Sequence, residues 1–457
     1  MISDKVIKTL EFDKIAEKVS SFAVLSTSKR KIACDRFDLS YKNVKFLLDK
    51  TNEAYDLYLN GVRGVVYFDE IEDELNLAEK LSTLPPSALL KVARLLRSSR
   101  ITSQEIIEFS ENKPLLYDIA CRIFFDNYVE NEIFSKIVNE DEVSDNASEK
   151  LFTIRKSIKR INEKIRERLQ SYMRAGANKF LQDNVVSMRN GRYVVPVKSE
   201  HLSSVKGFVH DRSASGSTFF IEPQEILDLN NELRSEILAE SIEVERILSE
   251  LTQKISTIVN PLRDNINYLT YIDVAFAKSE YSYKIKAVYP KLNANGVIDI
   301  KKGRHPLILP DKVVPVSVNF GKDYNYLLIS GPNTGGKTVT LKLIGLFVLM
   351  TAMGIFIPAI EGTVISVFDK IFVDIGDEQS IENSLSTFSS HVKNLINILD
   401  NADSKSLVLI DEIGAGTDPE EGSVLAQAIL EKFIEVRSFG VVTTHYSSLK
   451  EFAITNP

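Results

Sequence analysis

The chain has 457 residues, of which 44% are hydrophobic and 26% are charged, and its formal net charge is −7. This length is too great for one hydrophobic core and predicts about two to four domains of an ordinary globular protein. The cysteines Cys34 and Cys121 are too few and too far apart for a disulfide framework or a metal knuckle, which predicts a reducing, cytoplasmic location. The N-terminus has no basic stretch followed by an apolar run, so it predicts no signal peptide.

Residues 1–146 have the apolar spacing of helices and predict the first part of a helical core. Apolar residues recur every three or four positions over residues 41–60, and Gly61 can close that helix. A pair of prolines precedes Ser87, which can cap a helix over residues 88–97. We interpret this part as a scaffold, because it contains no pattern typical of chemistry.

Two long helical patterns follow, over residues 147–184 and 225–260. In the first, apolar residues recur at spacings of three and four over about two heptads, as in a coiled-coil seam. The second has a similar stripe and ends before Pro261, which stops or kinks a helix. We predict an antiparallel pair, a lever helix out and a lever helix back, followed by a closing part of the helical core over residues 261–294.

Residues 185–224, between these two helices, predict a small β-rich clamp. Asn190-Gly191 is the favoured two-residue turn of a β-hairpin, and apolar runs flank it. Further strands are predicted over residues 205–209 and 218–221.

Positive charge is concentrated in this arm. Residues 150–206 contain fourteen Lys or Arg against four Asp or Glu, a net of +10, so the rest of the chain sums to −17. A basic patch on an acidic protein is typical of a surface that binds nucleic acid. The alternative is a solvated coiled-coil face, on which alternating charges are normal. The candidate nucleic-acid contacts are Arg155, Lys156, Lys159, Arg160, Arg189, Arg192 and Lys198.

From residue 295 onward, strand and helix patterns alternate, which predicts a doubly wound α/β domain over residues 295–457. Residues 331–338 fit the phosphate-loop pattern, in which glycines let backbone N–H groups converge on phosphate oxygens. An apolar strand precedes the loop and an apolar helix follows it. Lys337 is expected to reach the β- and γ-phosphates of a nucleotide, and the Thr338 hydroxyl to bind Mg²⁺.

Residues 343–360 contain no charged residue, and their eighteen positions are enough to raise the alternative of a membrane span. The stretch begins inside the phosphate-loop helix and contains Gly345, Gly354 and Pro358. A phosphate loop must face an aqueous nucleotide. We therefore predict a buried helix and no membrane association.

Two acids, Asp411 and Glu412, end a buried strand about 75 residues after the phosphate loop. An acid at this point can hold Mg²⁺, usually through water, and the next acid can polarise an attacking water. His445 ends a further apolar strand about 33 residues later, where a side chain can sense the γ-phosphate. The alternative is an ordinary loop histidine.

Together these blocks resemble the MutS family of ABC-type ATPases. The blocks stand in the family's order across about the last 160 residues, and they are Gly331–Thr338, Ser386–Phe388, Asp411–Pro419 and Thr443–Tyr446. The tripeptide that contains His305 is similar to the family's lead-in to its nucleotide domain. The resemblance implies a multidomain fold. An all-α core with a long coiled-coil lever arm and a small β-rich clamp would precede an α/β ABC-type P-loop ATPase domain.

The resemblance also implies a role for each matching residue. The catalytic residues would be Glu412 as general base, His445 at the γ-phosphate or the attacking water, and Lys337 on the phosphates. Thr338 and Asp411 would hold Mg²⁺, and Asn333 would reach the γ-phosphate side. The nucleotide-binding residues would be Gly331, Pro332, Asn333, Thr334, Gly335, Gly336, Lys337, Thr338, Val339 and His305. The implied cofactors are ATP and Mg²⁺.

A homodimer is implied as well. Ser386 and Thr387 would act across the dimer interface on the partner's nucleotide, and residues 414–418 would form the loop that couples the two sites. Hydrolysis would then need two chains with their nucleotide domains face to face.

Some features differ from mismatch-repair members of the family, which begin with a mismatch-binding domain and use a Phe-any-Glu wedge. This chain starts in the helical core. Residues 68–70 and 109–111 fit that tripeptide, but a match of three residues occurs by chance. In lacking that domain, and in the sequence of residues 207–213 in the clamp, this chain resembles the second branch of the family. That branch is associated with branched recombination intermediates and with stalled or collided ribosomes.

Members of the second branch usually continue into a basic linker and a C-terminal Smr nuclease domain. This chain stops at Pro457, twelve residues after His445. We therefore expect an ATPase domain that is incomplete at its C-terminus, and nuclease activity only from a domain that lies outside this chain.

Two functions remain open. The first is an ATP-driven dimeric clamp that acts on branched DNA, suppressing homologous recombination, or on ribosomal RNA in stalled ribosomes, splitting and rescuing them. The second is a passive clamp whose ATP state sets only whether it is open or closed. A mismatch-repair role is disfavoured because the mismatch-binding domain is absent.

Overall fold

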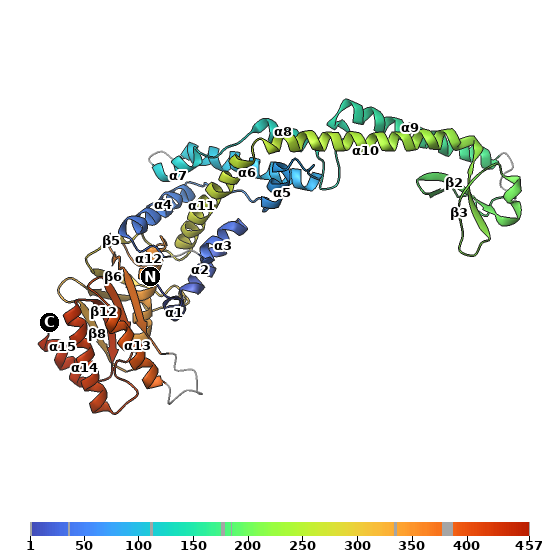
Figure 1. Ribbon diagram of the computed structural model, residues 1–457. Helices are drawn as coiled ribbons and strands as arrows, with labels where there is room; N and C mark the ends of the chain where they lie inside the picture. The colour runs from blue at the N-terminus through green and yellow to red at the C-terminus, as the bar shows by residue number, and fades with distance from the viewer. Residues whose placement is uncertain are drawn as a thin grey trace. The chain divides into compact units, whose positions relative to one another are not determined.

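The computed structural model describes residues 2–34, 37–109, 113–174, 179–183, 185–332, 336–376 and 387–456. The chain forms two compact units, whose segments can be followed by colour in Figure 1. The first unit consists of Met1–Phe68, Ser98–Ile123 and Asp264–Pro457. The second unit consists of Asp69–Arg97 and Phe124–Arg263. The chain thus leaves the first unit and returns to it, and the finer six-part division remains a prediction.

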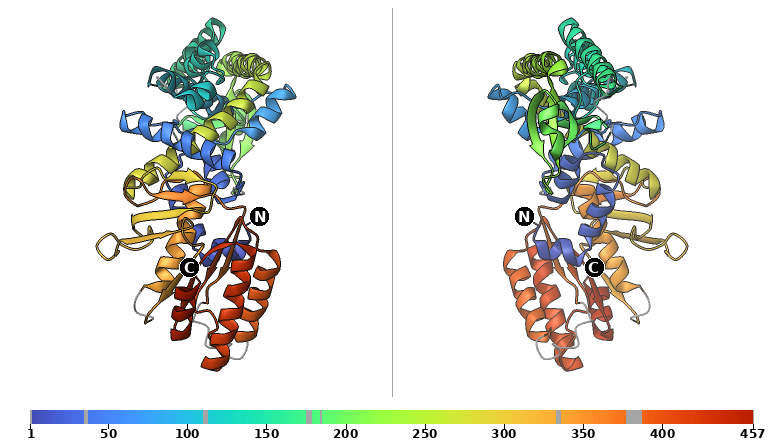
Figure 2. Two further views of the ribbon diagram at one scale, coloured as in Figure 1. Left: turned by 90° about the vertical axis from the view of Figure 1, so that its left-hand side faces the viewer. Right: turned by 90° about the vertical axis from the view of Figure 1, so that its right-hand side faces the viewer.

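A four-stranded parallel sheet lies in the C-terminal part of the first unit (Figures 1 and 2). Its order is β10-β11-β12-β8, and its strands are β8 (Tyr326–Ser330), β10 (Lys370–Asp374), β11 (Ser406–Ile410) and β12 (Phe439–Thr444). The strands β8, β11 and β12 lie where the sequence predicts strands before the phosphate loop, the two acids and His445. The central strand β11 is buried at every position, as expected for a parallel strand covered on both faces.

Helices cover both faces of this sheet, which confirms the doubly wound α/β prediction for this part of the chain. Successive side chains of a strand face opposite sides. Leu409 packs in one apolar cluster with α12 (Lys337–Ala352). Its neighbour Ile410 packs in another cluster with α13 (Thr387–Asn401) and α14 (Pro419–Val436).

The uncharged stretch that begins in α12 forms part of the interior of the first unit. Residues 343–359 are all buried. Gly345 marks the closest approach of α12 to its neighbours: a Cβ there would lie 2.6 Å from a methyl carbon of Leu409 and 2.8 Å from one of Leu10. Among the residues that the structure describes, no helix has both the length and the apolar character needed to cross a membrane.

The N-terminal helices α1 (Asp4–Thr9) and α2 (Phe12–Ser20) pack on the same side of the sheet as α12. Leu10, which lies between them, and Ile15 of α2 belong to the apolar cluster that contains Leu409 and most of α12. No pattern in the sequence indicated this contact. The start of the chain is therefore part of the compact unit that carries the phosphate loop.

A second sheet in the first unit was not predicted as a separate structure. Its strands stand in the order β5-β9-β6-β7, with one parallel pair, β5 with β9, and two antiparallel pairs. They are β5 (Lys291–Asn293), β6 (Ile298–Gly303), β7 (Val316–Phe320) and β9 (Val364–Ser366). The loop between β6 and β7 carries His305 and lies beside the start of α12.

The remaining helices of the first unit include α4 (Tyr41–Leu59), which agrees with the helix predicted over residues 41–60. Two further helices begin in one unit and end in the other, α6 (Pro86–Phe109) and α11 (Val259–Lys284). The prediction for α6 was wrong at both ends. Ser87 lies inside the helix, and the helix continues twelve residues beyond 97. A proline suits the first helical position because its missing N–H has no helical partner there. The first unit also contains the helices α3 (Ser26–Cys34), α7 (Pro114–Ala120) and α15 (Ser447–Thr455).

The second unit contains two long helices, α9 (Glu149–Arg174) and α10 (Leu227–Ser256). They pack side by side (Figure 1). The residues of the predicted apolar seam of α9 that are buried are Leu151, Ile154, Ile161 and Ile165. The helix predicted over residues 147–184 was too long, because residues 179–183 are not α-helical and Leu181 pairs with Val197 of the sheet. The helix α10 ends before Pro261, and α11 begins two residues before this proline. Shorter helices of this unit are α5 (Glu72–Glu79), α8 (Asn127–Lys136), η1 (Asp145–Ala147), η3 (Ser199–Ser204) and η4 (Gln224–Ile226).

An antiparallel sheet between α9 and α10 in the chain completes the second unit. Its order is β1-β2-β4-β3, and its strands are β1 (Ser187–Arg189), β2 (Arg192–Lys198), β3 (Gly207–Arg212) and β4 (Thr218–Pro223). Asn190 and Gly191 have φ angles of 50° and 74°, so the predicted two-residue hairpin turn is confirmed. Val195 of β2 and Ile161 of α9 share one apolar cluster, which fixes the sheet on the helix.

Candidate functional site

The phosphate-loop pattern joins the end of β8 to the start of α12, at the carboxyl edge of the parallel sheet. Gly331 and Gly336 have φ angles of 149° and 77°, a region that side chains beyond glycine avoid. Gly336 is the N-cap of α12, so the positive end of that helix lies at the loop. Pro332 is described, whereas Asn333, Thr334 and Gly335 lie outside the described residues.

Lys337 is buried at the first position of α12, with 4% of its surface exposed. Its Nζ donates to the carbonyl oxygen of Gly331 at 2.6 Å and lies 3.0 Å from Nε2 of His445. The ammonium thus connects the loop to the end of β12. An ammonium group can donate three hydrogen bonds, so Lys337 can also donate to phosphate oxygens bound at the loop.

Thr338 and Asp411, the two residues predicted to hold Mg²⁺, face each other. The Thr338 hydroxyl donates to Oδ2 of Asp411 at 2.6 Å, and the Thr443 hydroxyl donates to Oδ1 at 2.5 Å. These residues come from α12, the end of β11 and β12, which meet at one edge of the sheet. Hydroxyl and carboxylate oxygens are the ligands that Mg²⁺ prefers, so the donor set fits this ion.

Glu412 has a left-handed backbone, with φ of 52°, which is unfavourable for a residue other than glycine. Its N–H donates to the Thr443 hydroxyl at 2.7 Å, which holds this conformation in place. The carboxylate Oε1 lies 3.1 Å from Nε2 of His445. The structure therefore brings Lys337, Glu412 and His445 together, and strain of this kind collects at functional sites.

The loop after the two acids is held by close backbone packing. Gly414 has φ of 82°, and a Cβ there would lie 2.4 Å from the carbonyl oxygen of Gly422 in α14. The Tyr446 hydroxyl donates to the carbonyl of Gly414 at 2.8 Å. Burial raises the pKa of Tyr446, so this group remains a donor. Asp418 then caps α14 by accepting from the N–H of Glu420 at 2.9 Å.

The predicted trans residues are described only in part. Ser386 lies outside the described residues, and Thr387 is the first residue of α13. A cluster that sequence reasoning missed anchors this helix: Asn394 donates to Asp374 Oδ1 at 2.8 Å, and Nδ1 of His391 lies 3.0 Å from Oδ2. The hydrogen bond to Asp374 raises the pKa of His391. Asp374 ends an apolar strand beside the one that ends in Asp411 and Glu412, and this position at a strand end is the sequence signal that could have found it.

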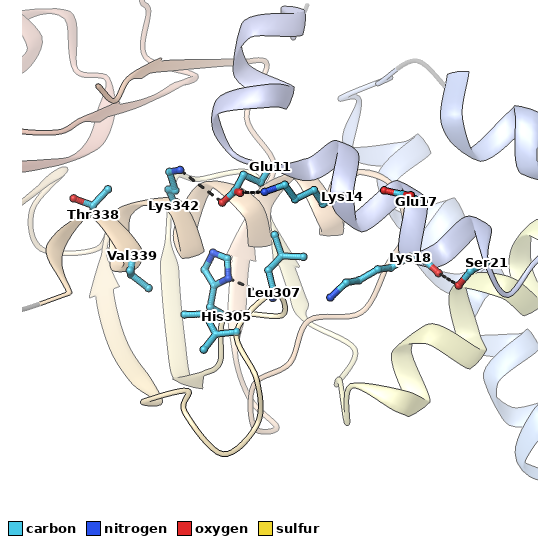
Figure 3. A pocket seen from close by; sticks show the side chains of 11 residues that line it. Glu11, Lys14, Glu17, Lys18, Ser21, His305, Leu307, Thr338, Val339 and Lys342 are labelled. Atoms are coloured by element: carbon cyan, nitrogen blue, oxygen red, sulfur yellow. Dashed lines mark hydrogen bonds and ion pairs between the residues drawn. The ribbon is translucent and has the colours of Figure 1, made fainter. Parts of the chain in front are cut away.

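His305 lies in the loop after β6 and is 7% exposed. It lines an open cavity of about 820 Å³ together with Thr338 and Val339 of α12 (Figure 3). Burial lowers the pKa of His305, which favours its neutral form. The structure thus places His305 beside the phosphate loop. Sequence reasoning missed the opposite wall of the cavity, which comes from α2.

The predicted nucleic-acid contacts divide into two groups. The guanidinium groups of Arg155 and Arg192 already have protein partners, Glu240 at 2.7 Å and Glu222 at 2.7 Å. Arg189 lies over the ring of Phe220 and 3.3 Å from Asp211.

The other predicted contacts lie on the surface of the second unit. Lys156, Lys159 and Arg160 are exposed on α9, and Lys198 is half-buried at the end of β2. In the part of the chain that the structure describes, none of these four forms an ion pair.

The parallel sheet, the phosphate loop and the acid pair define a P-loop nucleotide-binding domain of the ABC type. Residues 327–456 match the family described as MutS domain V. The chain is 44% identical over 459 residues to Endonuclease MutS2 of Clostridium botulinum (strain Okra / Type B1), and 43% identical over 457 residues to Endonuclease MutS2 of Clostridium beijerinckii. Both alignments cover 99% of this chain and 58% of the relative. These matches support a MutS-family member of the MutS2 type. The chain spans less than two thirds of the length of these relatives.

No group of three or more His, Cys, Asp or Glu side chains with the geometry of a metal site occurs among the described residues. The acid and hydroxyl pair at Thr338 and Asp411 would hold Mg²⁺ together with oxygens from a nucleotide, as phosphate-loop sites do.

Proposed function

We propose that this chain binds and hydrolyses Mg·ATP and uses the cycle to control a nucleic-acid clamp of the MutS2 type. The observation that carries the proposal is the meeting of three pairs at one edge of the parallel sheet. Lys337 contacts the carbonyl oxygen of Gly331, Thr338 contacts Asp411, and Glu412 contacts His445. Proteins of the MutS family are ATPases, which supports the same reading.

Each residue of the site would have its own role in hydrolysis. Lys337 would bind phosphate oxygens, helped by the positive end of α12. Glu412 would take a proton from the attacking water at Oε1, and Nε2 of His445 would orient that carboxylate. When bound at Thr338 and Asp411, Mg²⁺ would neutralise the charge on the phosphates.

A second chain would complete the site in this proposal. Ser386, and Thr387 at the start of α13, would reach the nucleotide of the partner. The loop over residues 414–418 would transmit the state of one site to the other. The close packing of Gly414 on Gly422 supports this role, because it connects the loop directly to α14. ATP turnover per chain should therefore rise with protein concentration.

The proposed nucleic-acid surface is the exposed cationic face of α9. Lys156, Lys159 and Arg160 lie within five residues of each other on this helix and are available to phosphate groups. Such contacts bind the backbone irrespective of base sequence. Branched DNA and ribosomal RNA both present this backbone, and comparing a DNA four-way junction with stalled ribosomes distinguishes the two targets.

The direct test of the proposed function is the substitution Glu412→Gln. The variant keeps the size of the side chain but removes the proton acceptor, so ATP binding should persist while turnover falls by about 10²–10⁴-fold. Glu435→Gln, on the exposed surface of α14, is the matched control and should change neither quantity. Unchanged turnover in E412Q would contradict the general-base role, and an unaltered chain that binds no ATP would contradict the proposed function itself.

A further inference from the structure

The cavity beside the phosphate loop has the size and position to receive more of a nucleotide than its phosphates. Its volume is about 820 Å³, and small-molecule sites in proteins span about 300–1,000 Å³. Thr338 and Val339 belong both to the phosphate-loop segment and to the wall of the cavity. A molecule whose phosphates lie on the loop would therefore extend past these residues into the cavity.

The chemistry of the walls suits a nearly neutral, partly apolar group. Leu307, Ile308 and Val339 supply apolar surface. Two carboxylates and three ammonium groups line the rest, so their charges almost cancel, and they belong to Glu11, Glu17, Lys14, Lys18 and Lys342. A further phosphate group would need a stronger positive field than this. A base and a ribose, with flat apolar faces and hydrogen-bonding edges, match the walls better.

Glu11 ties the two sides of the cavity together. It is the N-cap of α2, its φ angle is 58°, and its carboxylate pairs with Lys14 of α2 and, at 3.6 Å, with Lys342 of α12. Figure 3 shows these three side chains above His305. A strained backbone held by an ion pair across two elements is a feature that collects at functional sites.

Lys18 supplies a donor on the α2 wall. Its side chain extends from the helix toward the side on which His305 and Leu307 lie (Figure 3). It forms no ion pair with any of the residues that the structure describes. An ammonium donates hydrogen bonds and accepts none, so its natural partner is an acceptor atom of a base or a ribose.

We propose that α2 forms one wall of the nucleotide site, with the ribose and base in this cavity and Lys18 donating to them. The proposal rests on the proposed function, because it assumes that the phosphate loop binds ATP. One consequence follows for the N-terminal helices. A nucleotide that touches both α2 and α12 stabilises the contact between them, so nucleotide binding and the docking of residues 4–20 are linked.

The test compares ATP with inorganic triphosphate, which carries the phosphates alone, in calorimetric titrations of the same variants. Lys18→Ala removes the donor, and Ser21→Trp fills the cavity from the end of α2. Lys18→Ala should weaken ATP binding about tenfold or more, which is the effect of losing one hydrogen bond to a charged group. Ser21→Trp should weaken it at least as much, because the indole occupies the space of the base and ribose. Affinity for triphosphate should not change. Lys8→Ala and Asp13→Trp, on exposed positions of α1 and α2 outside the cavity, are the matched controls.

Hydrogen exchange gives a second readout that does not depend on the substitutions. ATP should slow the exchange of α2 amides in the unaltered chain, and triphosphate should slow it less. Unchanged ATP affinity in both K18A and S21W would overturn the proposal, as would equal weakening of ATP and triphosphate binding. Failure of the unaltered chain to bind either compound would instead refute the phosphate-loop function on which the proposal rests.

Discussion

Replacing Arg192 with alanine should destabilise the antiparallel sheet of the second unit. Glu222 in β4 is 1% exposed. Its carboxylate accepts from Arg192 Nη1 at 2.7 and 3.0 Å and from Asn230 at 2.8 Å, and it lies 2.6 Å from Nε2 of His210. Removal of the guanidinium leaves a buried carboxylate with too little compensating charge, which costs about 3–5 kcal/mol.

Hydrogen exchange of the amides in β2 and β4 measures this loss, because both strands belong to the sheet that contains Glu222 and Arg192. Arg189→Ala is the matched control on the same hairpin. That arginine lies over Phe220, with its guanidinium carbon 4.2 Å from the ring centre, and forms an exposed ion pair with Asp211, so its loss should cost about 1 kcal/mol or less.

A neutral partner offers a check on the cause. In the R192A background, Glu222→Gln should recover part of the lost stability, because a buried amide needs no counter-charge. If R192A costs less than about 1 kcal/mol, or if E222Q deepens the loss, the buried ion pair does not stabilise the sheet as argued.

Two further predictions concern the surface of α9 and the anchor of α13. Neutralising Lys156, Lys159 and Arg160 together should weaken binding equally for all nucleic-acid sequences. In anisotropy titrations, the slope of log binding constant against log salt concentration should fall by about three. An unchanged slope would show that this face is only solvated and does not contact phosphates. Because Asp374 raises the pKa of His391, their contact stabilises α13 fully below the ordinary histidine pKa and less as pH rises through the raised one. Amides of α13 should therefore exchange faster at pH 8 than local chemistry predicts, and His391→Gln should abolish that dependence.

The parallel sheet was predictable because its strands read as short apolar runs, and the central strands β11 and β12 are buried at nearly every position. The acids and the histidine stand where two of those runs end, and carboxyl ends of parallel strands meet at one edge. The second sheet was not predictable in this way. Two of its strands have three residues each, and β9 comes from a segment more than sixty residues after β6. Pairing over such distances leaves no local periodicity.

The charge of the arm shows why a count of charged residues along the sequence overstates the positive charge of the surface. The window over residues 150–206 has a net charge of +10, but it stops before β4 and α10. Glu222, Glu240 and Glu243 lie beyond it and pair with Arg192, Arg155 and Lys150 inside it. Antiparallel packing brings these acids back onto the basic segment. Of the predicted contacts on α9, Lys156, Lys159 and Arg160 remain exposed and outside these ion pairs.

His445 stands between the phosphate-loop lysine and the proposed general base. Its Nδ1 lies 3.4 Å from Nζ of Lys337, whereas its Nε2 makes the shorter contact with Lys337 and also contacts Glu412. Its Nε2 lies 3.0 Å from Nζ of Lys337 and 3.1 Å from Oε1 of Glu412. This atom can accept from the ammonium or donate to the carboxylate, but it cannot do both at once. If Lys337 turns to phosphate oxygens, His445 is left to hold Glu412. The histidine would therefore act on turnover through the glutamate and not on its own.

This coupling predicts non-additive kinetics. His445→Ala should lower kcat while leaving ATP binding nearly unchanged, because it removes the group that orients the Glu412 carboxylate and leaves the phosphate loop intact. In a chain that already carries E412Q, the same substitution should add little, since residues that act as one unit lose their effect together. Single-turnover rates of the two single variants and the double variant decide the matter. A double variant slowed by the product of the two single factors would show that His445 and Glu412 act independently, and the positioning role would then be wrong.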